Sequence, residues 1–193
     1  MMRLSGILAG MALVLGLAAC KEDRIRTMSL GLGGYAEAPV LVIAFEAGGI
    51  RDPLLPEVVD SGGDTFPRSF RSKSLEPPTG DPFLVRTTWI DIATGQAWEA
   101  EVKVDQDALT VEDGIAWVTA IFGPGARLVI GSDPTPVSTT VQTIDVARTC
   151  GTRRPDLDRD LGSEVDAIPF LREALASAKP EIASTTCTDG AVE

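Results

Sequence analysis

The chain has 193 residues, which predicts one or two domains, and its 44% hydrophobic and 23% charged residues are typical of a folded globular protein. It contains no histidine, which excludes Ser-His-Asp triads, histidine acid–base catalysis and most zinc sites. Its formal net charge of −11 argues against a nucleic-acid partner, because binding a phosphate backbone needs clustered Lys and Arg.

The N-terminus has the pattern of an export signal. Arg3 is followed by an apolar run from Leu4 to Ala19 that ends in small residues. This run is shorter than the roughly 20 residues that a helix needs to cross a bilayer. A plain signal peptide cleaved near Ala18–Ala19 and an uncleaved helical anchor are the two simpler interpretations.

The end of this run, Leu17-Ala18-Ala19-Cys20, resembles the lipobox of bacterial lipoproteins. The resemblance implies that residues 1–19 are a lipoprotein signal peptide, that Cys20 is acylated (palmitate included) and becomes the mature N-terminus, and that residues 20–27 form a tether. Lys21 stands where an aspartate would resemble the inner-membrane retention signal. The resemblance therefore implies an anchor in the outer membrane of a Gram-negative bacterium, facing the periplasm.

The body of the protein is expected over residues 28–193 as a single β-rich domain. Residues 31–34 (GLGG) lack the spacing and the lysine of a phosphate-binding loop, so they predict a flexible entry or a bulged edge strand. Residues 39–45 (PVLVIAF) predict a strand that is buried on both faces.

Residues 51–82 hold six prolines and predict a long irregular excursion with one short strand, held to the core by Phe66 and Phe70. Within it, residues 60–63 (DSGG) copy most of a serine-protease nucleophile motif. Because no histidine is present to accept the serine proton, we interpret these residues as a Gly-rich turn.

The segment from residue 83 to residue 104 predicts a hairpin. Residues 83–92 are strand-like, residues 93–96 (ATGQ) form a turn, and in residues 97–104 (AWEAEVKV) polar and apolar side chains alternate. Glu99 and Glu101 lie on one face of that second strand, where paired carboxylates can hydrolyse glycosides. Their regular alternation with apolar residues favours a solvated face instead.

Further strands are expected over residues 115–122, 127–130 and 137–146, the first two joined by a Gly-Pro-Gly turn. Cys150 and Cys187 form an even pair once Cys20 is acylated, and export to an oxidising compartment predicts a disulfide between them. Two free thiols, or a catalytic thiol that would have no histidine to activate it, are the alternatives.

Residues 156–166 (DLDRDLGSEVD) are the densest acidic stretch. Asp156, Asp158 and Asp160 have the alternate spacing that begins an EF-hand loop, with Glu164 as a further ligand for calcium. Leu161 and Ala167 occupy the positions where that loop needs glycine and glutamate. We therefore interpret the stretch as a solvated loop that leads to a helix N-terminus, with nearby arginines neutralising its carboxylates.

A helix is predicted from about Asp166 to Ala178, with Pro169 in its first turn and Pro180 stopping it. Its apolar stripe consists of Ile168, Leu171, Leu175 and Ala178. The fold class expected is mainly β: an antiparallel sheet or sandwich of about 6–8 strands with one C-terminal helix.

Residues 33–131 resemble a group of small Gram-negative lipoproteins, some of which are thought to act as immunity proteins against secreted antibacterial effectors. The resemblance rests on Gly34-Tyr35, a strand to Phe45 before Gly48-Gly49, the strands of Trp89 and Trp98, and a strand–turn–strand unit from Ile121 to Ile130. It implies an anchored protein that neutralises an effector by binding it.

We expect a lipid-anchored protein-binding module with no catalytic residues, no metal and no cofactor, whose acidic surface recognises a basic protein partner. A structural or assembly lipoprotein of an envelope complex is the alternative. A carboxylate- or metal-dependent envelope enzyme is the third possibility.

Overall fold

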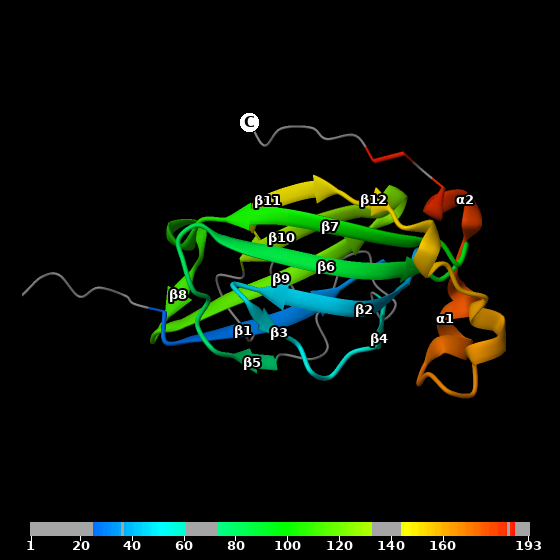
Figure 1. Cartoon of the computed structure of the whole chain (residues 1–193), viewed down its shortest axis with the longest axis horizontal. Coiled ribbons are helices and arrows are strands. Elements are labelled where there is room, and N and C mark those ends of the chain that lie inside the picture. Colours follow the sequence, from blue (N-terminus) through cyan, green and yellow to red (C-terminus); the bar gives the residue numbers. More distant parts are fainter. Residues whose placement is uncertain (1–24, 36, 61–72, 133–143, 185, 188–193) are drawn as a thin grey trace, which may run out of the picture.

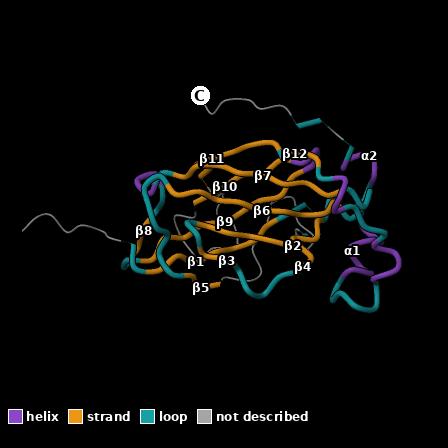
Figure 2. The backbone as a smooth tube through the Cα atoms, viewed as in Figure 1, coloured by secondary structure: helices purple, strands orange, loops and turns teal. Residues whose placement is uncertain are grey.

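The computed structural model describes residues 25–35, 37–60, 73–132, 144–184 and 186–187. Within these residues, twelve strands form two six-stranded sheets that share one core (Figure 1). Seven of these strands have six or more residues, and the other five have two or three. A mainly antiparallel β fold with a helix near the C-terminus is therefore confirmed. Figure 2 shows α1 and α2 together at one end of the sandwich.

The first sheet contains six strands: β5 (Lys73–Leu75), β1 (Thr27–Gly33), β9 (Ile115–Gly123), β10 (Arg127–Ser132) and β11 (Ile144–Cys150) in that order, with β8 (Val111–Glu112) beside β9. The predicted hairpin of β9 and β10 is confirmed, and its turn is the 3-10 segment Pro124–Ala126. Of the predicted strand over residues 137–146, only the part from Ile144 onward lies among the described residues, where it begins β11.

The interpretation of residues 31–34 as a flexible entry is wrong for Gly31 and Gly33, which belong to β1. This strand pairs in parallel with β9 from Thr27 opposite Ile115 to Gly33 opposite Ile121, with no bulge. Its antiparallel pairing with β5 covers only Met28–Leu30, so in the described residues Gly31 and Gly33 have a partner strand on one side, as at the edge of a sheet. Both glycines are buried. Their partner strand β9 lies almost 90 residues further along the chain, so the sequence around the glycines does not indicate this pairing.

The second sheet contains β12 (Thr152–Arg153), β7 (Ala97–Val104), β6 (Phe83–Asp91), β2 (Val40–Ala47) and β3 (Ile50–Arg51) in that order, with β4 (Glu57–Val59) also paired to β2. The predicted hairpin of β6 and β7 is confirmed, with Phe83 opposite Val104 and Ile90 opposite Ala97. The excursion over residues 51–82 contributes more than the one predicted short strand, since β4 and β5 both lie in it. Phe66, Phe70 and residues 61–63 lie outside the described residues.

A β-bulge in β2 adjusts which of its side chains face the core. The register with β6 shifts between Val42 and Ala44. Before the bulge Val40 and Val42 join the core, and after it Phe45 and Ala47 do. The extra residue thus keeps apolar side chains inward along the whole strand. The prediction that both faces of this strand are buried is wrong at Ala44, which is exposed.

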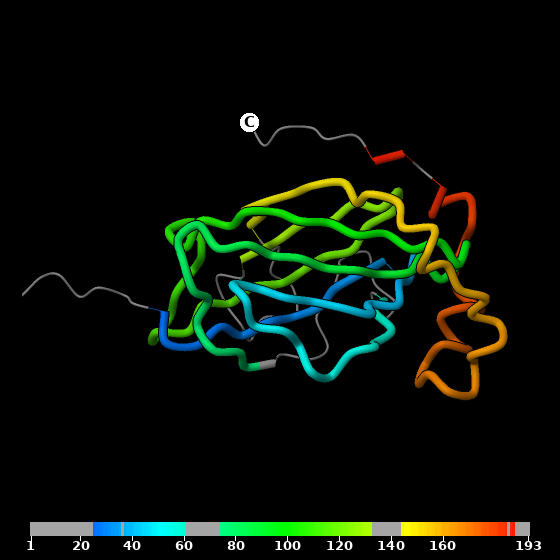
Figure 3. The backbone as a smooth tube through the Cα atoms, in the orientation of Figure 1, coloured from blue at the N-terminus to red at the C-terminus, as the bar shows by residue number. Residues whose placement is uncertain are grey.

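The centre of the core is aromatic. The rings of Trp89 and Phe122, one from each sheet, have centroids 5.3 Å apart and planes tilted by 60°. Next to them the chain passes from β11 in the first sheet to β12 in the second, which Figure 3 shows as one continuous yellow tube. The passage occurs at Gly151, where an added Cβ would lie 2.7 Å from Cη2 of Trp89.

The helical cap, residues 155–184, covers one end of the second sheet. Its apolar side chains pack on the outer face of β2, β6 and the start of β7, forming a second cluster of Leu41, Ile90, Ile92, Ala97, Leu161, Ile168, Leu171 and Ala174. The helix α1 (Leu171–Ser177) is shorter than predicted, because Phe170 before it adopts a left-handed φ of 64°. Pro180 follows the end of α1 and starts α2 (Pro180–Ala183). In the described residues no helix is long and apolar enough to cross a membrane.

Candidate functional site

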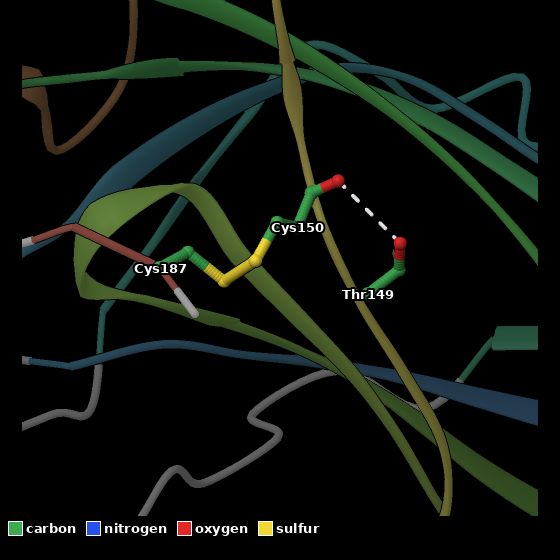
Figure 4. Close-up of a disulfide and its surroundings, with 3 residues drawn as sticks. All are labelled: Thr149, Cys150 and Cys187. Carbon is green, nitrogen blue, oxygen red and sulfur yellow. Dashed lines mark hydrogen bonds between the residues drawn. A yellow bond between two sulfur atoms is a disulfide. The ribbon is translucent and has the colours of Figure 1, made fainter. Parts of the chain in front are cut away.

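Cys150 and Cys187 form the predicted disulfide, with an S–S distance of 2.03 Å and Cα atoms 5.8 Å apart (Figure 4). Cys150 ends β11, and Cys187 follows α2. The bond therefore fixes the segment after the helical cap to the edge of the first sheet. Lys179 adds a second attachment, since its amide donates to the carbonyl of Glu37 at 2.9 Å and its ammonium pairs with the Glu37 carboxylate.

Each of the four carboxylates considered as calcium ligands has a partner within the protein. Asp156 pairs with Arg154 at 2.9 Å, and Glu164 lies 3.4 Å from Arg159. Asp160 accepts a hydrogen bond of 3.2 Å from the amide of Gly162. Over the described residues no three Asp, Glu or Cys side chains are grouped so that they would hold a metal ion.

Asp158 has the most contacts of the four. Both of its oxygens accept hydrogen bonds of 2.6 Å from the Arg153 guanidinium, and one also accepts from the amide of Ala97 at 2.9 Å. These bonds stabilise the charged form, so the Arg153 guanidinium, followed by the Ala97 amide, lowers the pKa of Asp158. The acidic stretch is thus bound to the start of β7.

The same guanidinium contacts an aromatic ring. The Cζ atom of Arg153 lies 5.5 Å from the ring centroid of Trp98, and its Nη1 donates to the carbonyl of Ala97 at 3.1 Å. The next residue, Arg154, donates its amide to that carbonyl at 2.9 Å. The chain therefore leaves the sandwich along a path held by ionic, aromatic and backbone contacts.

The outer face of the second sheet has a charge ladder, defined as Arg51, Glu46, Arg86 and Glu101. The closest N–O distances between successive members are 3.0, 3.8 and 2.6 Å. Glu99 is paired in the same way, with Arg154. The two glutamates considered as a glycosidase pair are therefore each bound by an arginine, as the carboxylates of a polar sheet face are.

Exposed carboxylates gather at the opposite end from the helical cap. This acidic end comprises Asp81, Asp105, Asp107, Glu112 and Asp113, from the loops around β8 (Figure 1). Asp81 connects two of these loops by accepting a hydrogen bond of 3.0 Å from the amide of Gln106. Arg26, just before β1, donates to the carbonyl of Asp113 at 2.8 Å, so the acidic end lies where the chain enters the domain.

Phe170 is the most exposed aromatic side chain of the described residues, with 63% of its surface accessible, and no sequence motif indicated it. The helix predicted from about Asp166 to Ala178 includes this position, but the predicted apolar stripe does not.

No protein-family model, curated protein or solved structure matches this chain. Any function must therefore be argued from its own residues.

Proposed function

We propose that the protein is a lipid-anchored periplasmic binding module, attached to the outer membrane through Cys20, that recognises a basic protein partner. The resemblance to small Gram-negative lipoproteins extends this proposal to an immunity role, in which the partner is a secreted effector. Two observations support the export part of it: the Leu17-Ala18-Ala19-Cys20 motif and the pairing of Cys150 with Cys187, since disulfides persist in oxidising compartments.

The distribution of charge is the observation that carries the binding part. Arginines neutralise carboxylates on the second sheet, through the charge ladder and the pair of Arg154 with Glu99. The helical cap has seven carboxylates, against three basic side chains of its own and the two arginines, Arg153 and Arg154, that pair with Asp158 and Asp156. The acidic end has five exposed carboxylates, which would accelerate the encounter with a positively charged protein.

The proposal is tested by recovering the partner from cells that produce the full-length lipoprotein. A partner bound through electrostatics should be basic, and its affinity should fall about tenfold or more between low and high salt. For the immunity role, co-production of the lipoprotein should protect cells from the partner's toxicity. A failure to recover any protein partner would contradict the proposal.

A further inference from the structure

The helical cap, residues 155–184, packs outside the core that the two sheets share. In the described residues that core includes twenty-four buried side chains and none from the cap. The cap contributes four buried side chains to the second cluster, on the outer face of the second sheet: Leu161, Ile168, Leu171 and Ala174. The core between the sheets is therefore complete without the cap, and the cap can leave the sheet without opening that core.

The cap is also the less stable of these two units. Its helices α1 and α2 have seven and four residues, which is too short for a helix to be stable by itself in water. The second cluster, which holds the cap on the sheet, has eight buried side chains. Segments with few buried apolar contacts open at a lower free energy than the strands of a packed core. We expect the cap to open before the sandwich unfolds.

The disulfide closes the cap into a loop. The chain leaves the first sheet after Cys150, and Cys187 is joined back to that residue through the bond (Figure 4). A closed loop restricts how far the cap can move, and therefore how much conformational entropy it gains on opening. Cleavage of the bond removes this restriction and leaves the end of the cap to noncovalent contacts, such as the exposed ion pair of Lys179 with Glu37.

We propose that the Cys150–Cys187 disulfide is a redox latch: its reduction lets the helical cap open from the second sheet while the sandwich stays folded. Both cysteines are partly exposed, within reach of a dithiol reductant. A thiolate of a dithiol reductase would attack one sulfur, and its second thiol would release the mixed disulfide. Two electrons pass to the bond, two protons end on Cys150 and Cys187, and the reductase becomes a disulfide.

Opening changes the surface that the protein presents. Beneath the cap, Leu41, Ile90 and Ile92 are 0%, 0% and 2% exposed, and they form an apolar patch on the outer face of the second sheet. An open cap would expose this patch to water. The latch depends on the disulfide and on the separation of the two clusters, and it stands whether or not the protein binds a basic partner.

The test is amide hydrogen exchange of the full-length protein in detergent, oxidised and reduced, without denaturant. The informative amides are those of Ala174, Ala178 and Lys179, which donate within α1, at its end and to Glu37. After reduction by a dithiol they should exchange at least about tenfold faster than before, and at least about tenfold faster than the amides of β6 and β9. The double variant Cys150→Ser/Cys187→Ser should show the fast exchange without reductant and should not respond to it.

Two results would overturn the latch. Unchanged exchange of the cap amides after reduction would show that the bond does not control opening. A common exchange rate for the cap and for β6 in the reduced protein would show that the cap opens only when the sandwich unfolds. Both results can be read from the wild type reduced after folding, so the test does not require the double variant to fold.

Discussion

Arg153 and Asp158 connect the C-terminal third of the chain to the sandwich. Arg153 lies over Trp98 and binds both oxygens of Asp158, which in turn accepts from the amide of Ala97. A bidentate arginine–carboxylate pair is geometrically specific and stronger than a neutral hydrogen bond. Because these contacts fix residues 153–158 on β7, the helical cap that follows is brought onto the face of the second sheet.

The Arg153–Asp158 pair predicts a particular dependence of stability on pH. The pKa of Asp158 is lowered in the folded state, so its contribution is complete above the ordinary aspartate pKa of about 3.9 and is lost as the pH falls through the lowered value. Asp158→Asn should therefore reduce the free energy of unfolding at neutral pH and flatten its decline in acid. Urea unfolding at a series of pH values measures this. For the control variant Asp107→Asn, at an exposed position, the plot of unfolding free energy against pH should run parallel to that of the wild type. A parallel plot for Asp158→Asn would contradict the role given to the Arg153–Asp158 pair.

Gly151 is required by its neighbour rather than by its backbone conformation. A Cβ at this position would lie 2.7 Å and 3.0 Å from two atoms of the Trp89 ring. Since Trp89 is packed in the centre of the core, Gly151→Ala should lower the free energy of unfolding by about 1–3 kcal/mol. Denaturant unfolding measures the loss, with the exposed Gly162→Ala as the control. Equal stability of the two variants would show that the core accommodates the methyl group.

Phe170 allows strain to be separated from side-chain packing. Phe170→Gly should raise the free energy of unfolding by about 1 kcal/mol, because a left-handed residue with a Cβ costs roughly 1–2 kcal/mol. Phe170→Ala keeps that strain and should remain close to the wild type. Thermal or urea unfolding of the three proteins is sufficient. A clear loss of stability in Phe170→Gly would mean that the ring stabilises the fold and is not merely strained.

At the scale of elements, the regular parts of the fold were predictable and the long-range parts were not. The alternation of residues 97–104 and the turn before it specify a hairpin locally, and β6 and β7 form it. The parallel pairing of β1 with β9 joins segments almost 90 residues apart, so the local sequence of the glycine-rich segment could not predict it. The start of α1 was misplaced because a left-handed phenylalanine contradicts the propensity on which helix prediction depends.

Some features of the candidate sites could be predicted from the sequence, and others could not. The disulfide followed from counting cysteines once export was assumed. The charge ladder could not be predicted, because it depends on the cross-strand register that sets Glu46 and Glu101 on either side of Arg86. Local neutralisation of the acidic stretch by arginines was foreseen, but the contact of Arg153 with Trp98 was not.

The disulfide should stabilise the domain by constraining the unfolded chain. Its cysteines are 37 residues apart, a loop for which the entropic model gives a stabilisation of about 4 kcal/mol. The double variant Cys150→Ser/Cys187→Ser should lose this amount in urea unfolding, and a reductant should reproduce the loss in the wild type. Unchanged stability in both would show that the attachment through Lys179 is sufficient to hold the end of the cap.

For the whole molecule, the two ends of the sandwich have different surroundings in the proposed envelope location. The acidic end lies beside the entry of the chain at Arg26, and the helical cap lies at the far end. An anchor at Cys20 would hold the acidic end toward the bilayer, because residue 20 lies only six residues before Arg26 in the chain. The cap would then face the periplasm, accessible to a partner.

The proposed anchoring predicts a simple change on substitution of Cys20. Full-length wild-type protein should be found in the membrane fraction, extractable by detergent and heavier than the polypeptide from residue 20 by its acyl chains. Cys20→Ala should be recovered in the soluble fraction. Cys150→Ser/Cys187→Ser serves as the matched cysteine control and should remain in the membrane. Retention of Cys20→Ala in the membrane would contradict lipid anchoring.

The binding of the partner recovered from cells to the purified protein, measured by titration calorimetry at low and at high salt, tests the proposed binding function most directly. A basic partner recognised by acidic surfaces should bind about tenfold or more weakly at high salt. Equal affinity at the two salt concentrations would contradict it.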